Sequence, residues 1–348
     1  MRRLARPLGR RVTAEYAGAV RRGRILVMIA LLPGLPGCGR GAPGPVRQAG
    51  QGVVSERRAP LPPPARTEVV GAAWDHRVAV LGGLTADGVP SAQVDLYDFL
   101  TDTWSPAPAL PVAVHHAGAG VLDGRLYVVG GYSGPAWAPT ADVWSLGRGE
   151  ARWRPEPPLS APRGALAVAT RRDALVAVGG VNGPDLVRTE ILDRGAAGWR
   201  RGPDLAVPRE HLAATAVGDR VYAIAGRAGS LESNRDSVES YAPGDSGWRA
   251  EPKLNHSRGG IGAATVGAAP PAFGASGGTA CVAGGEEPGD RTVADVECLH
   301  QGAWRVVTQL AVPRHGLAVV ADGRWLFAIG GGPKPGLHVS DVNEVFFF

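Results

Sequence analysis

Residues 199–226, WRRGPDLAVPREHLAATAVGDRVYAIAG, contain the pattern that decides the fold. A Trp is followed ten residues later by an Arg, and sixteen residues further on a small pair, Ala225-Gly226, ends an apolar run. The same anchors return with the same spacing after Trp153 and Trp304. Such self-similarity indicates one structural unit repeated along the chain.

The small pairs that end these units fall at regular intervals. Their first residues are Gly82, Gly130, Gly179, Ala225, Gly284 and Gly330. Neighbouring pairs are 46 to 49 residues apart, except for one step of 59 where an insertion precedes Gly284. A period of this size is typical of one four-stranded propeller blade, so the chain of 348 residues contains six such units.

Each unit shows the pattern of four short strands. After Arg209, the runs HLAATAV and RVYAIAG flank the turn pair Gly218-Asp219 and predict a hairpin. A third apolar run follows a polar loop, and a fourth carries the next Trp. The small residues of the first run suit a crowded central channel, whereas the Trp would fill the gap between blades. The sequence therefore predicts an all-β, six-bladed β-propeller.

The glycine pair, an aromatic residue about fifteen positions later and a Trp some twenty positions after the pair resemble the kelch repeat. This resemblance covers about residues 61–348 and implies a kelch-type propeller. Departures include Ala225 in place of the first Gly and Val114 in place of the Arg. The last unit ends without a Trp strand, so we expect residues 52–60 to supply the outer strand of the sixth blade and close the ring.

The N-terminal residues differ in composition from the repeats. Residues 1–37 combine eight Arg with the apolar run ILVMIALLPGLPG, which is the pattern of an export signal. Cys38 directly follows and resembles the lipidation site of bacterial lipoproteins; an ordinary secretory signal with an incidental Cys is the alternative. Residues 38–51 are expected to form a flexible tether and residues 52–348 the propeller. We therefore expect an exported protein of the bacterial cell envelope, in the periplasm or at the cell surface, attached to a membrane through lipid on Cys38.

The charge distribution argues against nucleic acid as a partner. The formal net charge is +5, but residues 1–37 hold eight of the 37 basic and one of the 32 acidic side chains. The remaining 29 basic and 31 acidic side chains nearly cancel, which removes the electrostatic case for phosphate binding. We expect a monomer.

The remaining cysteines and the acidic loops give no metal or cofactor motif. Cys281 and Cys298 are expected on neighbouring strands, where a disulfide and two small buried side chains both fit. No Cys/His ligand pattern occurs, and Glu286, Glu287 and Asp290 match no known metal loop. The sequence thus predicts neither a metal site nor a cofactor.

The best candidates for function are residues that differ from one repeat to the next at a position whose neighbours are the same in most repeats. Two positions after each repeated Arg, or its counterpart, stand Glu68, His116, Ala165, His211, Gly260 and Gly316. Strand alternation directs this position toward the channel mouth. In kelch propellers that bind peptides or sugars, this rim contributes ligand contacts, so the resemblance makes Glu68, His116 and His211 the leading candidates. A merely solvated rim is the alternative.

Three further residues are candidate ligand contacts. Trp137 lies in a Pro-flanked loop, where it would stack on a sugar, anchor a peptide or fold back on its own blade. The repeated Arg is first interpreted as architectural, because it recurs in most units. Arg209 and Arg314 are nevertheless kept as candidates because they flank the same rim.

Two functions follow from these residues. The first is a non-catalytic binding module of the envelope that recognises a protein or a glycan. The alternative is a carbohydrate-processing enzyme that resembles the six-bladed kelch sialic-acid mutarotases, with Glu68 or Glu210 and either His211 or an Arg as an acid/base pair. Copper radical oxidases also use kelch-like propellers, but the Tyr and Cys residues of this chain do not assemble their motif.

Overall fold

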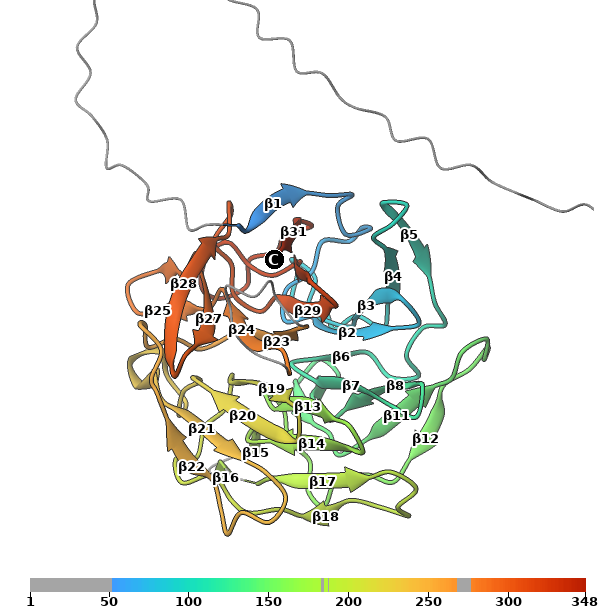
Figure 1. The fold of residues 1–348 in the computed structure, drawn as a ribbon. Coiled ribbons are helices and arrows are strands. Elements are labelled where there is room, and N and C mark those ends of the chain that lie inside the picture. The colour runs from blue at the N-terminus through green and yellow to red at the C-terminus, as the bar shows by residue number, and fades with distance from the viewer. Residues whose placement is uncertain (1–51, 183–184, 187, 268–276) are drawn as a thin grey trace, which may run out of the picture. The chain divides into compact units, whose positions relative to one another are not determined.

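The computed structural model describes residues 52–182, 185–186, 188–267 and 277–348. The predicted signal, Cys38 and the tether lie outside these described residues. Six four-stranded antiparallel sheets are arranged around a common centre (Figure 1). Among the described residues, no helix is long and apolar enough to cross a membrane.

The six sheets are the blades, here numbered 1 to 6. Blades 1 and 2 consist of β2 (Val70–Trp74), β3 (Arg77–Leu81), β4 (Val94–Asp98), β5 (Thr103–Pro106), β7 (Gly118–Leu122), β8 (Arg125–Val129), β11 (Val143–Leu146) and β12 (Arg154–Glu156). Blades 3 and 4 consist of β13 (Ala167–Arg171), β14 (Ala174–Val178), β17 (Glu190–Asp193), β18 (Arg200–Arg201), β19 (Ala213–Val217), β20 (Arg220–Ile224), β21 (Val238–Tyr241) and β22 (Arg249–Glu251). Blades 5 and 6 consist of β23 (Gly262–Val266), β24 (Thr279–Ala283), β27 (Asp295–His300), β28 (Ala303–Gln309), β29 (Ala318–Asp322), β30 (Trp325–Ile329), β31 (Asn343–Phe347) and β1 (Val54–Arg57).

Short elements in the links and loops lie outside the blades. They are β6 (Val114–His115), β9 (Tyr132–Ser133), β10 (Ala138–Pro139), β15 (Val181–Asn182), β16 (Asp185–Leu186), β25 (Glu286–Glu287), β26 (Arg291–Thr292) and the 3-10 helix η1 (Leu231–Ser233). Several of them hold side chains of the site described below.

Blade 6 combines strands from the two ends of the described chain. β1 pairs antiparallel with β31, with Val54 opposite Phe347 and Arg57 opposite Glu344. β1 is thereby the outermost strand of a sheet whose other three strands are C-terminal (Figure 1). This pairing covers the outer edge of β31, which would otherwise present unpaired backbone groups to solvent.

The innermost strands pack closely at the channel, and this explains their small residues. A Cβ on Gly118 of β7 would overlap Val168 of β13, and a Cβ on Gly262 of β23 would overlap Val319 of β29. Larger side chains at these two positions would push neighbouring blades apart.

In blades 1 to 5, a Trp beside or on the outer strand links the blade to the preceding one. The indole of Trp153 donates a hydrogen bond to the carbonyl of Pro108, at 2.8 Å, and that of Trp199 donates to Pro157, at 3.0 Å. Trp104 donates at 2.9 Å to the carbonyl of Ala59, which follows β1. The bond from Trp104 therefore links blade 1 to the segment that completes blade 6.

The repeated Arg is fully or almost fully buried and neutralised by an acid on the third strand of its own blade. The pairs are Arg66 with Asp95, Arg163 with Glu190, Arg209 with Glu239, Arg258 with Glu297 and Arg314 with Glu344. In four of these pairs the same carboxylate also accepts a backbone N–H from the link that precedes the Arg. Each pair thus fixes the link to the blade.

Blade 2 lacks both partners of this pair. Val114 occupies the Arg position, and Trp144 occupies the position that holds an acid on the other third strands. A carboxylate buried there without its Arg would be costly. The Arg and the acid are thus both absent from the same blade, as expected if each is there to neutralise the other. This confirms that the repeated Arg has a structural role.

Cys281 and Cys298 form a disulfide, with an S–S distance of 2.03 Å. They face each other across β24 and β27, and both are buried. The sequence left two alternatives open at these positions, and the structure contains the bonded one.

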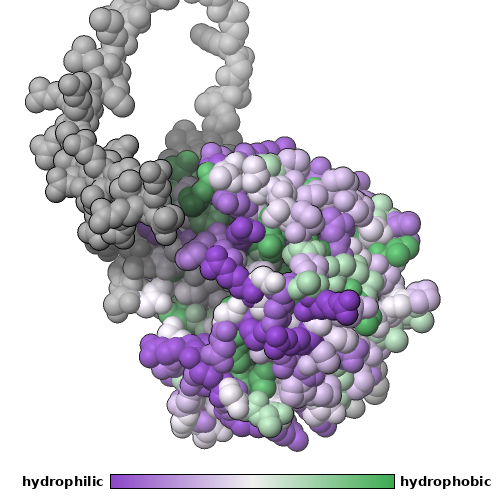
Figure 2. Space-filling model, turned by 90° about the vertical axis from the view of Figure 1, so that its right-hand side faces the viewer, coloured by the Kyte–Doolittle hydropathy of each residue, from purple (hydrophilic) through white to green (hydrophobic). Residues whose placement is uncertain are grey.

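The outer surface is mainly hydrophilic on the side shown in Figure 2, where hydrophobic residues form small, separate patches. This face therefore lacks the continuous apolar area that is typical of a large docking surface.

We predict that Glu297→Gln lowers the free energy of unfolding by about 3–5 kcal/mol, because it leaves the guanidinium of Arg258 buried without a counter-charge. Urea denaturation measures this loss. The matched control is Asp204→Asn in the exposed pair with Arg201, which should change stability by less than about 1 kcal/mol. An equal effect of both substitutions would contradict the role given to the buried pair.

Candidate functional site

The six varying rim residues form a ring around the channel mouth. All adopt left-handed backbone conformations, with φ between 51° and 63°: Glu68, His116, Ala165, His211, Gly260 and Gly316. The N–H of each of the last five donates to the carbonyl of the preceding member, at 2.8 to 3.2 Å, and Val69 N–H donates to Gly316 at 3.2 Å. The backbone of the rim is therefore fixed independently of its side chains.

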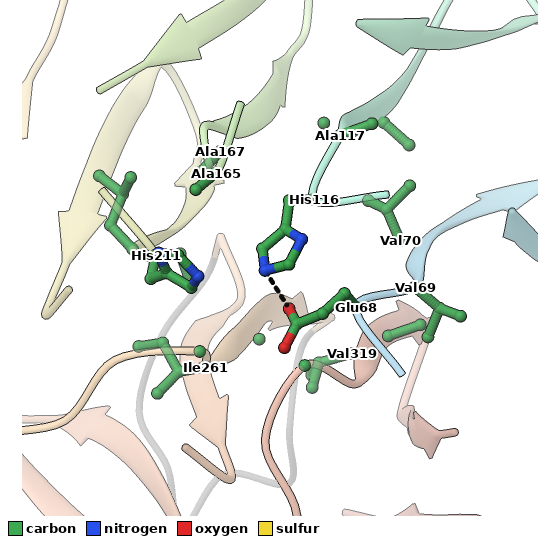
Figure 3. Close-up of a pocket in the computed structure, with 18 of the residues that line it drawn as sticks. Glu68, Val69, Val70, His116, Ala117, Ala165, Ala167, His211, Ile261 and Val319 are labelled. Atoms are coloured by element: carbon green, nitrogen blue, oxygen red, sulfur yellow. Dashed lines mark ion pairs between the residues drawn. The ribbon is translucent and has the colours of Figure 1, made fainter. Parts of the chain in front are cut away.

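Glu68 and His116 point toward one another across this ring (Figure 3). Oε2 of Glu68 lies 3.1 Å from Nε2 of His116, and Oε1 lies 3.1 Å from Nδ1 of His315. Burial alone would raise the pKa of Glu68, but His116 and the hydrogen bond from His315 hold it well below its ordinary value. Glu68 is thus a carboxylate at neutral pH.

His211 lies on the other side of His116, with a distance of 4.8 Å between the ring centroids (Figure 3). Its Nδ1 contacts Oε2 of Glu210. Burial lowers the pKa of His211 well below its ordinary value, and the neighbouring Arg227 and His116 lower it further. Burial also lowers the pKa of His116, although Glu68 opposes this. Both rings are therefore neutral at neutral pH.

A second set of charged residues completes the floor of the site. Arg227 contacts Glu210, at 3.3 Å, and Glu286. Glu286 in turn lies 3.6 Å from Nδ1 of His315. Burial would lower the pKa of His315, but the hydrogen bond to Glu68 and the charge of that carboxylate raise it. Acidic and basic groups from blades 1, 2, 4, 5 and 6 thus form one continuous network.

A cavity of about 490 Å³ lies above this network. Its lining residues are Thr67, Glu68, Leu84, His115, His116, Tyr132, Trp137, His211, Arg227, Leu231, Glu286, His315, Gly336 and Leu337. The charged and imidazole groups gather at the channel mouth, whereas the aromatic and aliphatic side chains come from the surrounding loops.

Trp137 forms part of the wall and is 42% exposed. Its indole donates to the carbonyl of Gly88 in the loop of blade 1, at 3.3 Å, and its ring lies 4.8 Å from that of His115. Burial and the neighbouring His116 lower the pKa of His115 to about 3, so this ring is neutral. Trp137 therefore contacts the loop of blade 1 and lines the cavity.

The structure separates Arg209 and Arg314 from the other candidates. Both are fully buried, and their guanidinium groups bond to Glu239 and Glu344 within their own blades. A ligand at the rim has no access to them, so we do not retain them as ligand contacts.

Glu68, His116 and His211 together form a group that could hold a metal ion. One ligand atom from each lies within 4.8 Å of the others. No metal motif predicts this group, since its members are 48 and 95 residues apart in sequence. Other network members, such as Arg227 and Glu286, stand in loops where the sequence alone gives no reason to select them.

Comparison with known proteins supports kelch repeats in this chain. Residues 113–160 match the family model described as the Kelch motif. The chain is similar to human Kelch-like protein 34, with 35% identity over 120 residues, which is 33% of this chain and 19% of that protein. It is also similar to an F-box/kelch-repeat protein of Arabidopsis thaliana, with 39% identity over 69 residues, 20% of this chain and 18% of that protein. Each match spans less than a fifth of the relative's length.

One solved structure, titled "Structure of YjhT", shows the same fold. It superposes with a TM-score of 0.67 and 17% sequence identity, and the match covers 81% of this chain and 95% of that one. At this identity the likeness concerns the fold alone. With the six four-stranded sheets of the described residues, it shows an all-β, six-bladed β-propeller, in which residues 113–160 match the Kelch motif.

Proposed function

We propose that this propeller is an exported binding module of the cell envelope that takes a saccharide-sized ligand into the cavity at its channel mouth. The observation that supports this most directly is the combination of an aromatic wall with a charged, hydrogen-bonding floor. The wall contains Trp137 and Tyr132, and the floor contains Glu68, His116 and His211.

The size and chemistry of the cavity favour a small glycan over a protein partner. A volume of about 490 Å³ is in the range of small-molecule pockets. The indole of Trp137, which lines the cavity, suits the C–H face of a sugar ring, while carboxylate and imidazole groups suit its hydroxyls. A protein partner would need a broad surface, and the charged groups here converge on one point instead.

We predict that Trp137→Ala weakens saccharide binding at least tenfold, since it removes the stacking surface. An array of mono- and oligosaccharides identifies the ligand, and calorimetry then compares the variants. Leu100→Ala is the control, because Leu100 is 80% exposed and lies in the turn after β4, outside the cavity. Unchanged affinity in the Trp137 variant would contradict the proposed binding mode.

A second candidate function is mutarotation of a reducing sugar. The observation that favours it is the convergence of Glu68 with two imidazoles on the cavity floor, because acid/base groups within hydrogen-bond reach of a sugar hydroxyl can move its proton. This would make the protein an enzyme instead of a binding module.

Proton NMR of anomer exchange separates the two functions. If the protein is an enzyme, it accelerates exchange of a bound sugar, and Glu68→Gln reduces the rate by about 10²-fold or more. We expect no acceleration by the wild-type protein. Acceleration that disappears in the variant would replace the binding module with the enzyme.

We also propose that lipid on Cys38 attaches the protein to a membrane. Cys38→Ala should move it from the membrane fraction to the soluble fraction, because a Cys→Ala change removes the thiol that would carry the lipid. Cell fractionation and mass spectrometry of the N-terminal peptide measure both changes. Continued membrane association of the variant would contradict the anchor.

A further inference from the structure

We infer that Glu68, His116 and His211 form a site for one divalent transition-metal ion, with Zn²⁺ as the best match, at the mouth of the channel. Two imidazoles and one carboxylate are a common ligand set for zinc, which binds their nitrogen and oxygen atoms at about 2 Å. The three ligand atoms lie within 4.8 Å of one another, so small side-chain rotations bring them around one ion.

The fold holds these three ligands in place before any ion binds. Each comes from a rim position whose backbone conformation and hydrogen bonds are shared by all six blades. Glu68 is also restrained through its other oxygen, since Oε1 lies 3.1 Å from Nδ1 of His315. Oε2 therefore remains on the side of the imidazoles.

A second, independent observation is the partner of each imidazole on the side away from the metal position. Nδ1 of His211 contacts the carboxylate of Glu210, and Nδ1 of His116 lies 2.5 Å from Nδ1 of His115. Both rings thus leave Nε2 for the site. A carboxylate or other polar partner on the opposite ring nitrogen is the arrangement that orients histidine ligands in metal sites.

The charges around the site favour a cation. Three carboxylates belong to the network, from Glu68, Glu210 and Glu286, and Arg227 contacts two of them. Carboxylates therefore outnumber the guanidinium in this part of the site. An excess of carboxylates favours a cation, and three protein ligands would leave one coordination position of Zn²⁺ open to the cavity.

This inference goes beyond saccharide binding and does not require it. The test uses the full chain, stripped of metal with a chelator and titrated with Zn²⁺ in a calorimeter, with elemental analysis of the dialysed protein. We expect one Zn²⁺ per chain and a loss of affinity of at least 100-fold in His116→Ala and in His211→Ala. His338→Ala is the matched control, because His338 is an exposed histidine of the loop between β30 and β31, outside the group, and the variant should bind zinc like wild type.

A positioning variant tests the site without removing a ligand. Glu210→Gln should lower zinc affinity about 10–100-fold, as loss of a carboxylate partner does in other sites. Thermal unfolding of each variant without metal confirms that it is folded. Co²⁺ as a probe should give the absorption bands of a site with nitrogen and oxygen ligands, and these bands should be absent in His211→Ala.

The metal site is overturned if the wild-type protein takes up no more zinc than a His116→Ala/His211→Ala double variant. It is also overturned if neither single substitution reduces zinc uptake. Saccharide binding measured with and without Zn²⁺ separates this inference from the proposed function. A protein that binds sugar but takes up no zinc overturns the metal site alone. A protein that binds zinc at these residues but no sugar supports the metal site and overturns the saccharide module.

Discussion

The buried pairing of a guanidinium with a carboxylate is the constraint on which most of this propeller depends. A charged side chain buried inside a blade is very costly unless a group of opposite charge lies beside it. The Arg of the link therefore forms an ion pair with the acid of the third strand, as Arg258 does with Glu297. In the five blades that have this pair, it places the residue two positions after the Arg at the channel mouth. In blade 2 Val114 and Trp144 replace the pair, yet His116 still takes its rim position, because backbone hydrogen bonds to Glu68 and Ala165 hold it there.

The site itself is asymmetric within this repeated frame. Blades 1, 2 and 4 supply Glu68, His116 and His211, whereas the other rim positions are Ala165, Gly260 and Gly316. Ala165, Gly260 and Gly316 leave the channel mouth open on their side, whereas the three larger residues place hydrogen-bonding groups in it. Loops then supply Trp137 on one side and the Arg227–Glu286 pair on the other. A cavity with distinct walls is thus built from units that are otherwise alike.

Much of the fold could be predicted from the sequence because its signals are local and repeated. Trp, Arg and the glycine pair recur at fixed spacing, and each has one physical role in every copy. The rim residues could be selected because they vary inside that constant frame. Their partners could not, since contacts such as His315 to Glu68 join residues nearly 250 positions apart. The sequence also misplaces Arg209 and Arg314 among the ligand contacts. The residues that follow them in sequence line the cavity, but their own side chains are buried and paired with Glu239 and Glu344.

The left-handed backbone of the rim has a consequence for how such a site can change over evolutionary time. Residues branched at Cβ are strained at φ near +50°, whereas Gly, Asn, Asp and His are tolerated comparatively well. Val, Ile and Thr are therefore disfavoured at these six positions, which hold Gly, Ala, Glu and His. The backbone keeps branched side chains out of the channel mouth but accepts hydrogen-bonding and ion-binding groups. New specificities can arise there one blade at a time, without disturbing the strands beneath.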